Sequence, residues 1–442
     1  MLTYKKTCAA LAPLLLLASA ASAGDPGPRR FRLTTVMEST CDPGVPPFEC
    51  PANSITPFGF RCPAINSWGT VAVQAEDENG RDKVFTVRRD GVRTLIADAN
   101  TRANGSAGYP TTCDDGFSSI TSDPSINELN EVSFQANLRR LSTCPSTPGQ
   151  QRQGIFLGGG GPLKVISHTI NGPEANFSEY LVADSPCNTL GQVAIVPEIQ
   201  TTFDSGLFTG NRVGNIQKRY LLSDPDTDFR GISQRVSLNE LGQIAFQTVK
   251  RPDGGTSSTQ GIFLSNPDGT FRTLVDAPAR GFDSVFDPSL NNLARLAFLG
   301  FKTVEGEQVI GIYSTWGGAV STEADNSARF GAARAFSGFQ EPSINDLGMV
   351  AFSADTNHFC TPEDFLPEQG VFAGGDVRKD KVLSTCDRYQ GLQVTGVTMC
   401  AEGLNNSGEI VMLVGSSVFD PETFTFPTKT WVVKATPLPD HH

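Results

Sequence analysis

Apolar and polar positions alternate along this chain in short runs, and one such run recurs seven times at intervals of 51 to 61 residues. Each copy begins with asparagine, carries glycine or a substitute three residues later, and continues into a segment such as Ile244-Ala245-Phe246. A large, a small and a large apolar side chain in succession predict a strand that is buried on both faces. The copies begin at Asn66, Asn127, Asn188, Asn239, Asn291, Asn345 and Asn405.

The start of each copy has the chemistry of a tight turn. Asparagine at the first position and glycine at the fourth fit a type I turn, in which asparagine caps its own backbone and glycine accepts a positive φ. The second copy has Asn130 in place of glycine, and asparagine is the next residue best able to adopt a left-handed conformation. Ala294 takes this place in the fifth copy and fits it less well.

Further strands follow most copies of the motif. The fourth copy is the clearest, with strand patterns at 261–264 and 271–275 separated by a turn sequence. Asp-Gly and Gly-Gly pairs separate similar strands in other copies and are typical of β-hairpins. The third copy diverges most, over residues 203–228.

Seven units of three or four antiparallel strands predict an all-β fold, a seven-bladed β-propeller over residues 24–442. The last copy has no room for its third strand after Val433, whereas the strand pattern at 31–36 precedes the first motif and has no copy of its own. We therefore expect the N-terminal strand to complete blade seven and close the ring. A linear stack of β units is the alternative.

The N-x-x-G-x-x-A-F repeats over residues 60–415 resemble those of the exported bacterial "choice-of-anchor" tandem-repeat proteins. The resemblance implies no catalytic residues. Members of that group often carry a C-terminal surface anchor, and residues 437–442 do not resemble one, so a free secreted or periplasmic protein is expected.

Residues 1–23 have the pattern of a secretory signal peptide. Lys5 and Lys6 precede a short apolar run, and small residues up to Ala23 supply a cleavage site. No later segment approaches the ~20 apolar residues of a membrane-spanning helix. The mature protein is expected outside the cytoplasm without a membrane span.

The net charge of the chain excludes two classes of binding partner. The 35 Lys and Arg residues against 47 Asp and Glu give a net charge of −12, and removal of Lys5 and Lys6 with the signal peptide makes it −14. Nucleic acids and anionic membranes select basic surfaces, so neither is an expected partner. We expect a monomer that binds an extracellular protein or glycan.

Nine of the ten cysteines remain after loss of the signal peptide, and in an oxidising compartment most should pair. Loops that emerge on the same face of a propeller suggest two pairs, and a third pair is expected in the segment that closes the ring. An odd number leaves at least one cysteine without an intramolecular partner, and Cys187 and Cys400 are expected to be buried thiols. The expected disulfides are Cys360–Cys386, Cys113–Cys144 and Cys41–Cys50.

Candidate metal chemistry is confined to three alternating carboxylates, Asp224, Asp226 and Asp228, which suggest a Ca²⁺ loop. Phe229 stands where such a loop needs glycine, so a solvated loop between blades is the alternative, and no other cofactor is expected. His168 and His358 fall in different repeats and are not expected to act together. Common hydrolase and metalloprotease signatures are missing from the sequence.

These features favour a non-catalytic binding module and name no catalytic residue. The alternative is a secreted carbohydrate-active enzyme, a polysaccharide lyase or glycosidase, with its site at the mouth of the propeller channel. The fold alone supports neither. The enzyme would require arginine, tyrosine, histidine or paired carboxylates from different blades to converge at that mouth.

Overall fold

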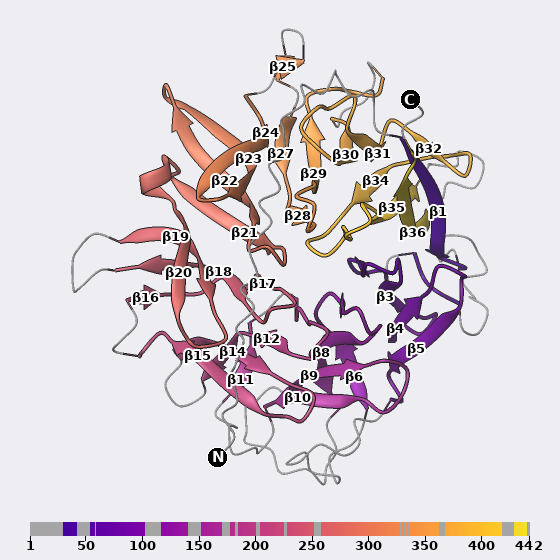
Figure 1. Cartoon of the computed structure of the whole chain (residues 1–442). Helices are drawn as coiled ribbons and strands as arrows, with labels where there is room; N and C mark the ends of the chain where they lie inside the picture. Colours follow the sequence, from indigo (N-terminus) through magenta and orange to yellow (C-terminus); the bar gives the residue numbers. More distant parts are fainter. Residues whose placement is uncertain are drawn as a thin grey trace, which may run out of the picture.

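The computed structural model describes residues 30–41, 54–57, 59–101, 116–139, 152–169, 177–181, 184–199, 204–224, 228–251, 258–327, 329–330, 333–334, 336–361, 367–417 and 428–439. Within these residues the strands are joined by turns and loops, and the one helical segment is the 3₁₀ turn η2 (Pro278–Arg280). Seven antiparallel sheets surround a common centre (Figure 1). The predicted all-β, seven-bladed propeller is confirmed.

The first four blades follow one another along the chain, and the inner strand of blades two and four is divided in two. In blade three the division falls in the next strand, between β12 and β13, which agrees with the divergent sequence of the third copy. Their strands are β2 (Ala64–Ile65), β3 (Val71–Glu76), β4 (Asp82–Val87) and β5 (Arg93–Asp98) in blade one; β6 (Phe117–Ile120), β7 (Ser125–Ile126), β8 (Val132–Leu138), β9 (Gln153–Gly158) and β10 (Lys164–His168) in blade two; β11 (Phe177–Tyr180), β12 (Val193–Ile195), β13 (Pro197–Ile199), β14 (Asp204–Gly210) and β15 (Ile216–Leu221) in blade three; and β16 (Phe229–Arg230), β17 (Val236–Leu238), β18 (Ile244–Lys250), β19 (Thr259–Ser265) and β20 (Phe271–Asp276) in blade four.

The last three blades repeat this plan, and two short hairpins accompany them. Their strands are β21 (Ser284–Leu290), β22 (Leu296–Val304), β23 (Glu307–Trp316) and β24 (Ala319–Asp325) in blade five; β27 (Phe336–Phe339), β28 (Ser343–Ile344), β29 (Val350–Thr356), β30 (Gln369–Phe372) and β31 (Lys381–Ser384) in blade six; and β34 (Gly396–Thr398), β35 (Ile410–Ser417) and β36 (Thr428–Pro437) in blade seven. The hairpins are β25 (Arg329–Phe330) with β26 (Ala333–Arg334), and β32 (Arg388–Tyr389) with β33 (Leu392–Gln393).

The ring closes within blade seven, as the sequence predicts. The N-terminal strand β1 (Phe31–Glu38) pairs antiparallel with β36, so that Thr35 lies opposite Val433. The strand order β34-β35-β36-β1 therefore combines the two ends of the chain in one sheet, where the indigo strand lies beside the yellow ones (Figure 1).

The repeated motif forms the predicted turn between the inner strand and the next strand of a blade. In the first copy, the side-chain Oδ1 of Asn66 accepts hydrogen bonds from the backbone N–H of Trp68 (3.1 Å) and of Thr70 (3.0 Å). Gly69 adopts φ +76°, and the residues that replace glycine in the second and fifth copies, Asn130 and Ala294, also have positive φ. The left-handed conformation at this position is thus kept in both substituted copies.

The motif asparagines also join the blades to one another. The side-chain Nδ2 of each donates to the backbone oxygen of the motif asparagine in the next blade, at 2.9 to 3.2 Å. The last of these bonds runs from Asn405 back to Asn66 and completes a circle of seven hydrogen bonds. Every motif asparagine is buried, so its side-chain polar groups need hydrogen-bond partners within the protein.

Apolar cores lie between successive blades. In the core between blades five and six, the small side chain of Ala297 lies in the same cluster as the buried rings of Phe336, Phe352 and Phe372. This arrangement agrees with the predicted packing of large residues on one sheet against alanine on the next. No helix among the described residues has the length and apolar character needed to cross a membrane.

The predictions for Cys187 and Cys400, both expected to be buried thiols, have different outcomes. Cys187 is a free, buried thiol, as expected. The expectation that Cys400 is also a buried thiol is wrong, because it forms a disulfide with Cys62, 338 residues away in sequence. Closure of the ring places blade seven beside blade one and brings these two cysteines to a Cα–Cα distance of 5.8 Å.

Candidate functional site

Charged side chains from several blades meet in the central channel. They occupy one repeat position, four residues before the motif asparagine, and we call the seven residues at this position the channel layer. Its members in blade order are Cys62, Asp123, Asp184, Arg235, Asp287, Glu341 and Ala401.

The local sequence interrupts the inner strand at the channel layer. In blades two, four and six the layer residue lies between the two halves of the divided strand, and in blade five the register shifts between Phe286 and Ser289. Pro124, Pro288 and Pro342 directly follow layer residues and lack the N–H that a continuous ladder needs. Such interruptions change the direction of a side chain relative to the sheet.

Arg235 of blade four is the centre of the channel layer. Its guanidinium lies 2.7 Å from a carboxylate oxygen of Glu341, 3.6 Å from Asp184 and 3.8 Å from Asp287. Glu341 belongs to blade six, so its contact with Arg235 passes over blade five, which requires both side chains to point toward the channel. The backbone of Asp123 bridges that of Asp184 between blades two and three.

Burial and mutual repulsion alter the ionisation of these carboxyl groups. Burial raises the pKa of Asp184 to about 7, with Arg235 opposing the shift and neighbouring carboxylates adding to it. Burial also raises the pKa of Asp123 and of Asp287. For Arg235, burial acts to lower the pKa, but the surrounding carboxylates outweigh it and raise the pKa overall, so this side chain is cationic.

Glu402, next to the channel layer, has a structural partner. Serines two residues before the motif asparagine accept a hydrogen bond from the next blade, as Ser237 does from the N–H of Leu290 (3.0 Å). Blade one has Ala64 at that position, and the carboxyl group of Glu402 instead reaches the N–H of Ile126. Burial raises the pKa of Glu402 to about 8. This carboxyl group is therefore mainly protonated at neutral pH.

A cavity of about 150 Å³ lies on the ring axis beside this glutamate. Motif asparagines of five blades line it, together with Glu402, so it is polar and lies at the end of the channel where the motif turns are. The channel thus combines a charged layer with a polar cavity.

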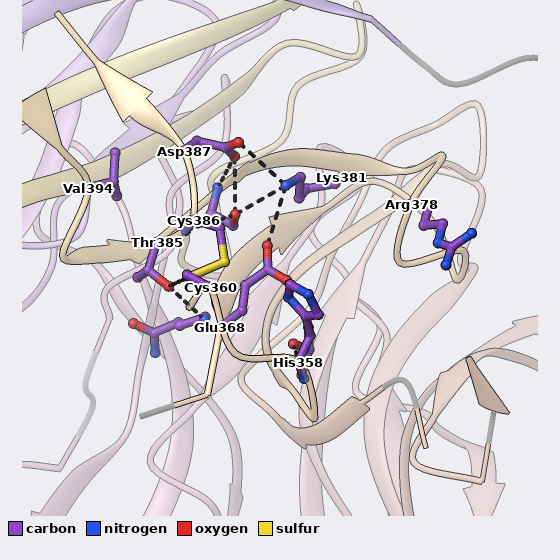
Figure 2. A network of polar contacts seen from close by, with 12 residues as sticks. His358, Cys360, Glu368, Arg378, Lys381, Thr385, Cys386, Asp387 and Val394 are labelled. Carbon is purple, nitrogen blue, oxygen red and sulfur yellow. Dashed lines mark hydrogen bonds and ion pairs between the residues drawn. A yellow bond between two sulfur atoms is a disulfide. The ribbon is translucent and has the colours of Figure 1, made fainter. Parts of the chain in front are cut away.

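A second group of polar side chains lies in the loops of blade six, where Cys360 and Cys386 form a disulfide (Figure 2). This is the pair expected from loops that share a face. Beside it the buried carboxylate of Glu368 lies 3.2 Å from Nδ1 of His358 and 3.3 Å from Nζ of Lys381. A cavity of about 740 Å³ has the disulfide in its wall.

Comparison with known proteins places the chain in a family. The model of a family of unknown function, DUF7453, matches residues 49–365. The chain belongs to this family. No curated protein gives a significant match to the sequence.

Solved structures match this chain with low similarity. An acylaminoacyl peptidase from Pyrococcus horikoshii is 11% identical with a TM-score of 0.46, over 81% of this chain and 50% of the peptidase, so this chain spans half the length of that enzyme. The polysaccharide lyase Uly1 is 9% identical with a TM-score of 0.44, over 86% of this chain and 90% of the lyase. Identity this low does not transfer either activity to this family member.

The predicted Ca²⁺ loop stays a prediction, because Asp226 lies outside the described residues. Asp224 accepts hydrogen bonds from Lys218 Nζ and from the N–H of Leu221, both at 2.9 Å, and Asp228 directly precedes β16. The carboxylate of Asp224 thus already makes hydrogen bonds within a turn.

The remaining residues considered in the sequence analysis either lie in different blades or fall outside the described residues. His168 ends β10 in blade two, whereas His358 follows β29 in blade six. Cys41 is disulfide-bonded, and its expected partner Cys50 lies outside the described residues, as do both cysteines of the expected pair Cys113–Cys144.

The channel layer was not predicted from the sequence. A signal was available, because alignment of the seven copies four residues upstream of the asparagine gives an acidic residue in four of them. Three of the four, Asp123, Asp287 and Glu341, are followed by proline and serine.

Proposed function

We propose that the protein is an exported, non-catalytic binding module, which holds a positively charged group of an extracellular protein or glycan at the channel layer. The observation that supports this is the convergence of Asp184, Asp287 and Glu341, from three blades, on the single guanidinium of Arg235.

The argument rests on the charge of the layer. Four carboxylates against one guanidinium leave a formal charge of −3 when all groups are ionised. Partly buried charges cost folding free energy, and apolar side chains of similar size often stabilise a protein as well or better. Raised carboxyl pKa values beside a specific charge partner are typical of functional sites. A cationic ligand would offset the excess negative charge.

Export is supported by the disulfides Cys62–Cys400 and Cys360–Cys386, since such bonds persist in oxidising compartments. It is supported also by the signal-peptide pattern of residues 1–23 and by the resemblance to exported repeat proteins. We extend the proposal to a monomer, because the ring closes within one chain.

Titration calorimetry with oligolysine, oligoarginine and oligosaccharides of chitosan tests this proposal, with oligoglutamate and a neutral glycan as controls. We expect the cationic probes to bind. The variants Asp184→Asn and Glu341→Gln should each weaken binding by about tenfold, which corresponds to ~1.4 kcal/mol. Glu305→Gln, which removes an exposed carboxylate from the turn after β22, is the matched control and should bind as the wild type does.

Binding should also depend on pH. A cation favours the ionised form of Asp184, so the affinity for oligolysine and oligoarginine, which stay charged over this range, should rise as pH increases through 7, near the pKa of that group. Equal binding of cationic and anionic probes, or unchanged affinity in both channel variants, would contradict the proposal.

The alternative is a carbohydrate-active enzyme that uses the same channel, and the grouping of Arg235 with carboxylates from other blades is an arrangement of the kind that such an enzyme requires. A carboxyl group with a pKa of about 7, here Asp184, fits a general acid, and Arg235 beside it could neutralise a uronate. An enzyme would release reducing ends, or unsaturated products absorbing in the ultraviolet, from extracellular polysaccharides. Turnover that is lost in Asp184→Asn would favour this alternative over binding alone.

A further inference from the structure

We infer that the blade-six loops form a zinc site whose ligands are available only when the Cys360–Cys386 disulfide is reduced. The blade-six site consists of His358, Cys360, Glu368 and Cys386. This inference is independent of the channel layer.

The donor atoms are already close together (Figure 2). An imidazole nitrogen of His358, a carboxylate oxygen of Glu368 and Sγ of Cys386 lie within 4.8 Å of one another. Cys360 adds a fourth donor, since its sulfur is bonded to that of Cys386. Two thiolates, an imidazole and a carboxylate are a ligand set that Zn²⁺ accepts in tetrahedral geometry.

The His358–Glu368 separation agrees with metal coordination. Bond lengths of ~2.0–2.1 Å in a tetrahedron place nitrogen and oxygen ligands ~3.3 Å apart. The observed distance between Nδ1 of His358 and Oε2 of Glu368 is 3.2 Å. The imidazole is exposed while the carboxylate is buried, so an ion can enter from solvent on the histidine side.

Lys381 holds the other oxygen of this carboxylate. Its Nζ lies 3.3 Å from Oε1 of Glu368 and 3.4 Å from Asp387, and it also contacts Ser384. Glu368 is therefore oriented with Oε1 toward Lys381 and Oε2 toward the site. Two thiolates and one carboxylate bound to Zn²⁺ carry an excess negative charge, which the ammonium group of Lys381 compensates as an outer-shell partner.

Reduction replaces the S–S bond by two thiols. A dithiol reductant supplies two electrons and two protons and becomes a cyclic disulfide. A phosphine supplies two electrons and takes the oxygen of a water molecule to become a phosphine oxide, and that water supplies the two protons. Each thiol loses its proton when its sulfur binds Zn²⁺. In the reverse direction a disulfide oxidant accepts the two electrons, the S–S bond forms again, and the ion leaves because a disulfide sulfur is not an anionic ligand.

Cobalt titration tests the site on the full-length protein. The protein is reduced with a phosphine, freed of reductant under anaerobic conditions, and titrated with Co²⁺. We expect one thiolate-to-cobalt charge-transfer band that saturates at one equivalent, disappears when Zn²⁺ is added, and does not form in the oxidised protein. Oxidation of the zinc-loaded protein should release one Zn²⁺, measured with a chromophoric chelator.

Variants assign the ligands. Cys360→Ser/Cys386→Ser should lose the band, and Lys381→Gln should keep it but bind Co²⁺ about tenfold more weakly. Cys187→Ser and Cys62→Ser/Cys400→Ser control for three of the other cysteines and should keep it. If the Cys360→Ser/Cys386→Ser variant does not fold, alkylation of the reduced wild type should remove the band instead. A band that persists in that variant, or no band in reduced wild type of native circular dichroism, overturns the inference.

Discussion

The circle of motif asparagines makes a quantitative prediction for Asn345→Ala. The Asn345 side chain accepts hydrogen bonds from the N–H groups of Leu347 (3.1 Å) and Met349 (3.0 Å), and donates one to the oxygen of Asn405 (3.0 Å). Asn345 is 3% exposed and its bond to Asn405 is buried, so the oxygen of Asn405 would lose a buried partner, while the two N–H groups of the turn are partly buried. At ~1 kcal/mol for each bond, the free energy of unfolding should fall by ~3 kcal/mol.

Asn211→Ala is the matched control. The side chain of Asn211 makes the same two turn contacts, with the N–H groups of Val213 and Asn215 (both 3.1 Å), but at an exposed hairpin turn. Water can replace these bonds, so the loss should be ~1 kcal/mol or less. Urea denaturation of both variants, under non-reducing conditions and with the m-value compared to the wild type, gives the two losses. Equal losses would refute the claim that contacts between the blades make the motif asparagines important.

Three further outcomes are expected. Glu402 has a folded pKa of about 8, above its ordinary value, so the wild type should lose stability as pH rises from about 5 to 8. In Glu402→Gln, denaturation at these two pH values should show a smaller loss of stability. An equal loss in this variant would argue against a protonated carboxyl group at Glu402. Arg235→Gln removes the cation that favours ionisation of Asp184 and should raise the pKa of that carboxyl group above 7, measured by NMR titration; an unchanged value would contradict the ion pairing. Cys62→Ser/Cys400→Ser removes a cross-link over 338 residues and should lower the free energy of unfolding, measured by thermal denaturation, by ~4 kcal/mol. A change below ~1 kcal/mol would show that pairing of the terminal strands is enough to keep the ring closed.

Most of the fold follows from local chemistry that the sequence displays. The turn at Asn66 and Gly69 needs only residues that are neighbours in the chain, and so does each hairpin. The pairing of β1 with β36 was predictable because the last repeat lacks a strand and the N-terminus supplies one. Cys360 and Cys386 were predictable because both loops belong to one blade.

The site depends on distances across the ring, which a repeat pattern does not display. Contact between Arg235 and Glu341 joins blades four and six, and the Cys62–Cys400 disulfide joins the first and last copies of the motif. Both require the circular arrangement, which brings together residues far apart in the sequence. The asparagines recur because every blade needs the turn, whereas the channel layer varies from cysteine to acid to arginine and therefore escapes a search for identity.

The closed circle of blades changes the order in which parts of this protein are expected to unfold. A linear array of repeats has two terminal units with one neighbour each, and it frays from those units. Here each blade has two neighbours, because the side chain of Asn405 bonds to Asn66. Blade seven alone is assembled from both ends of the chain, through β1 and β36. Blade seven therefore holds the ring closed, and hydrogen exchange should show β1 opening before any other strand.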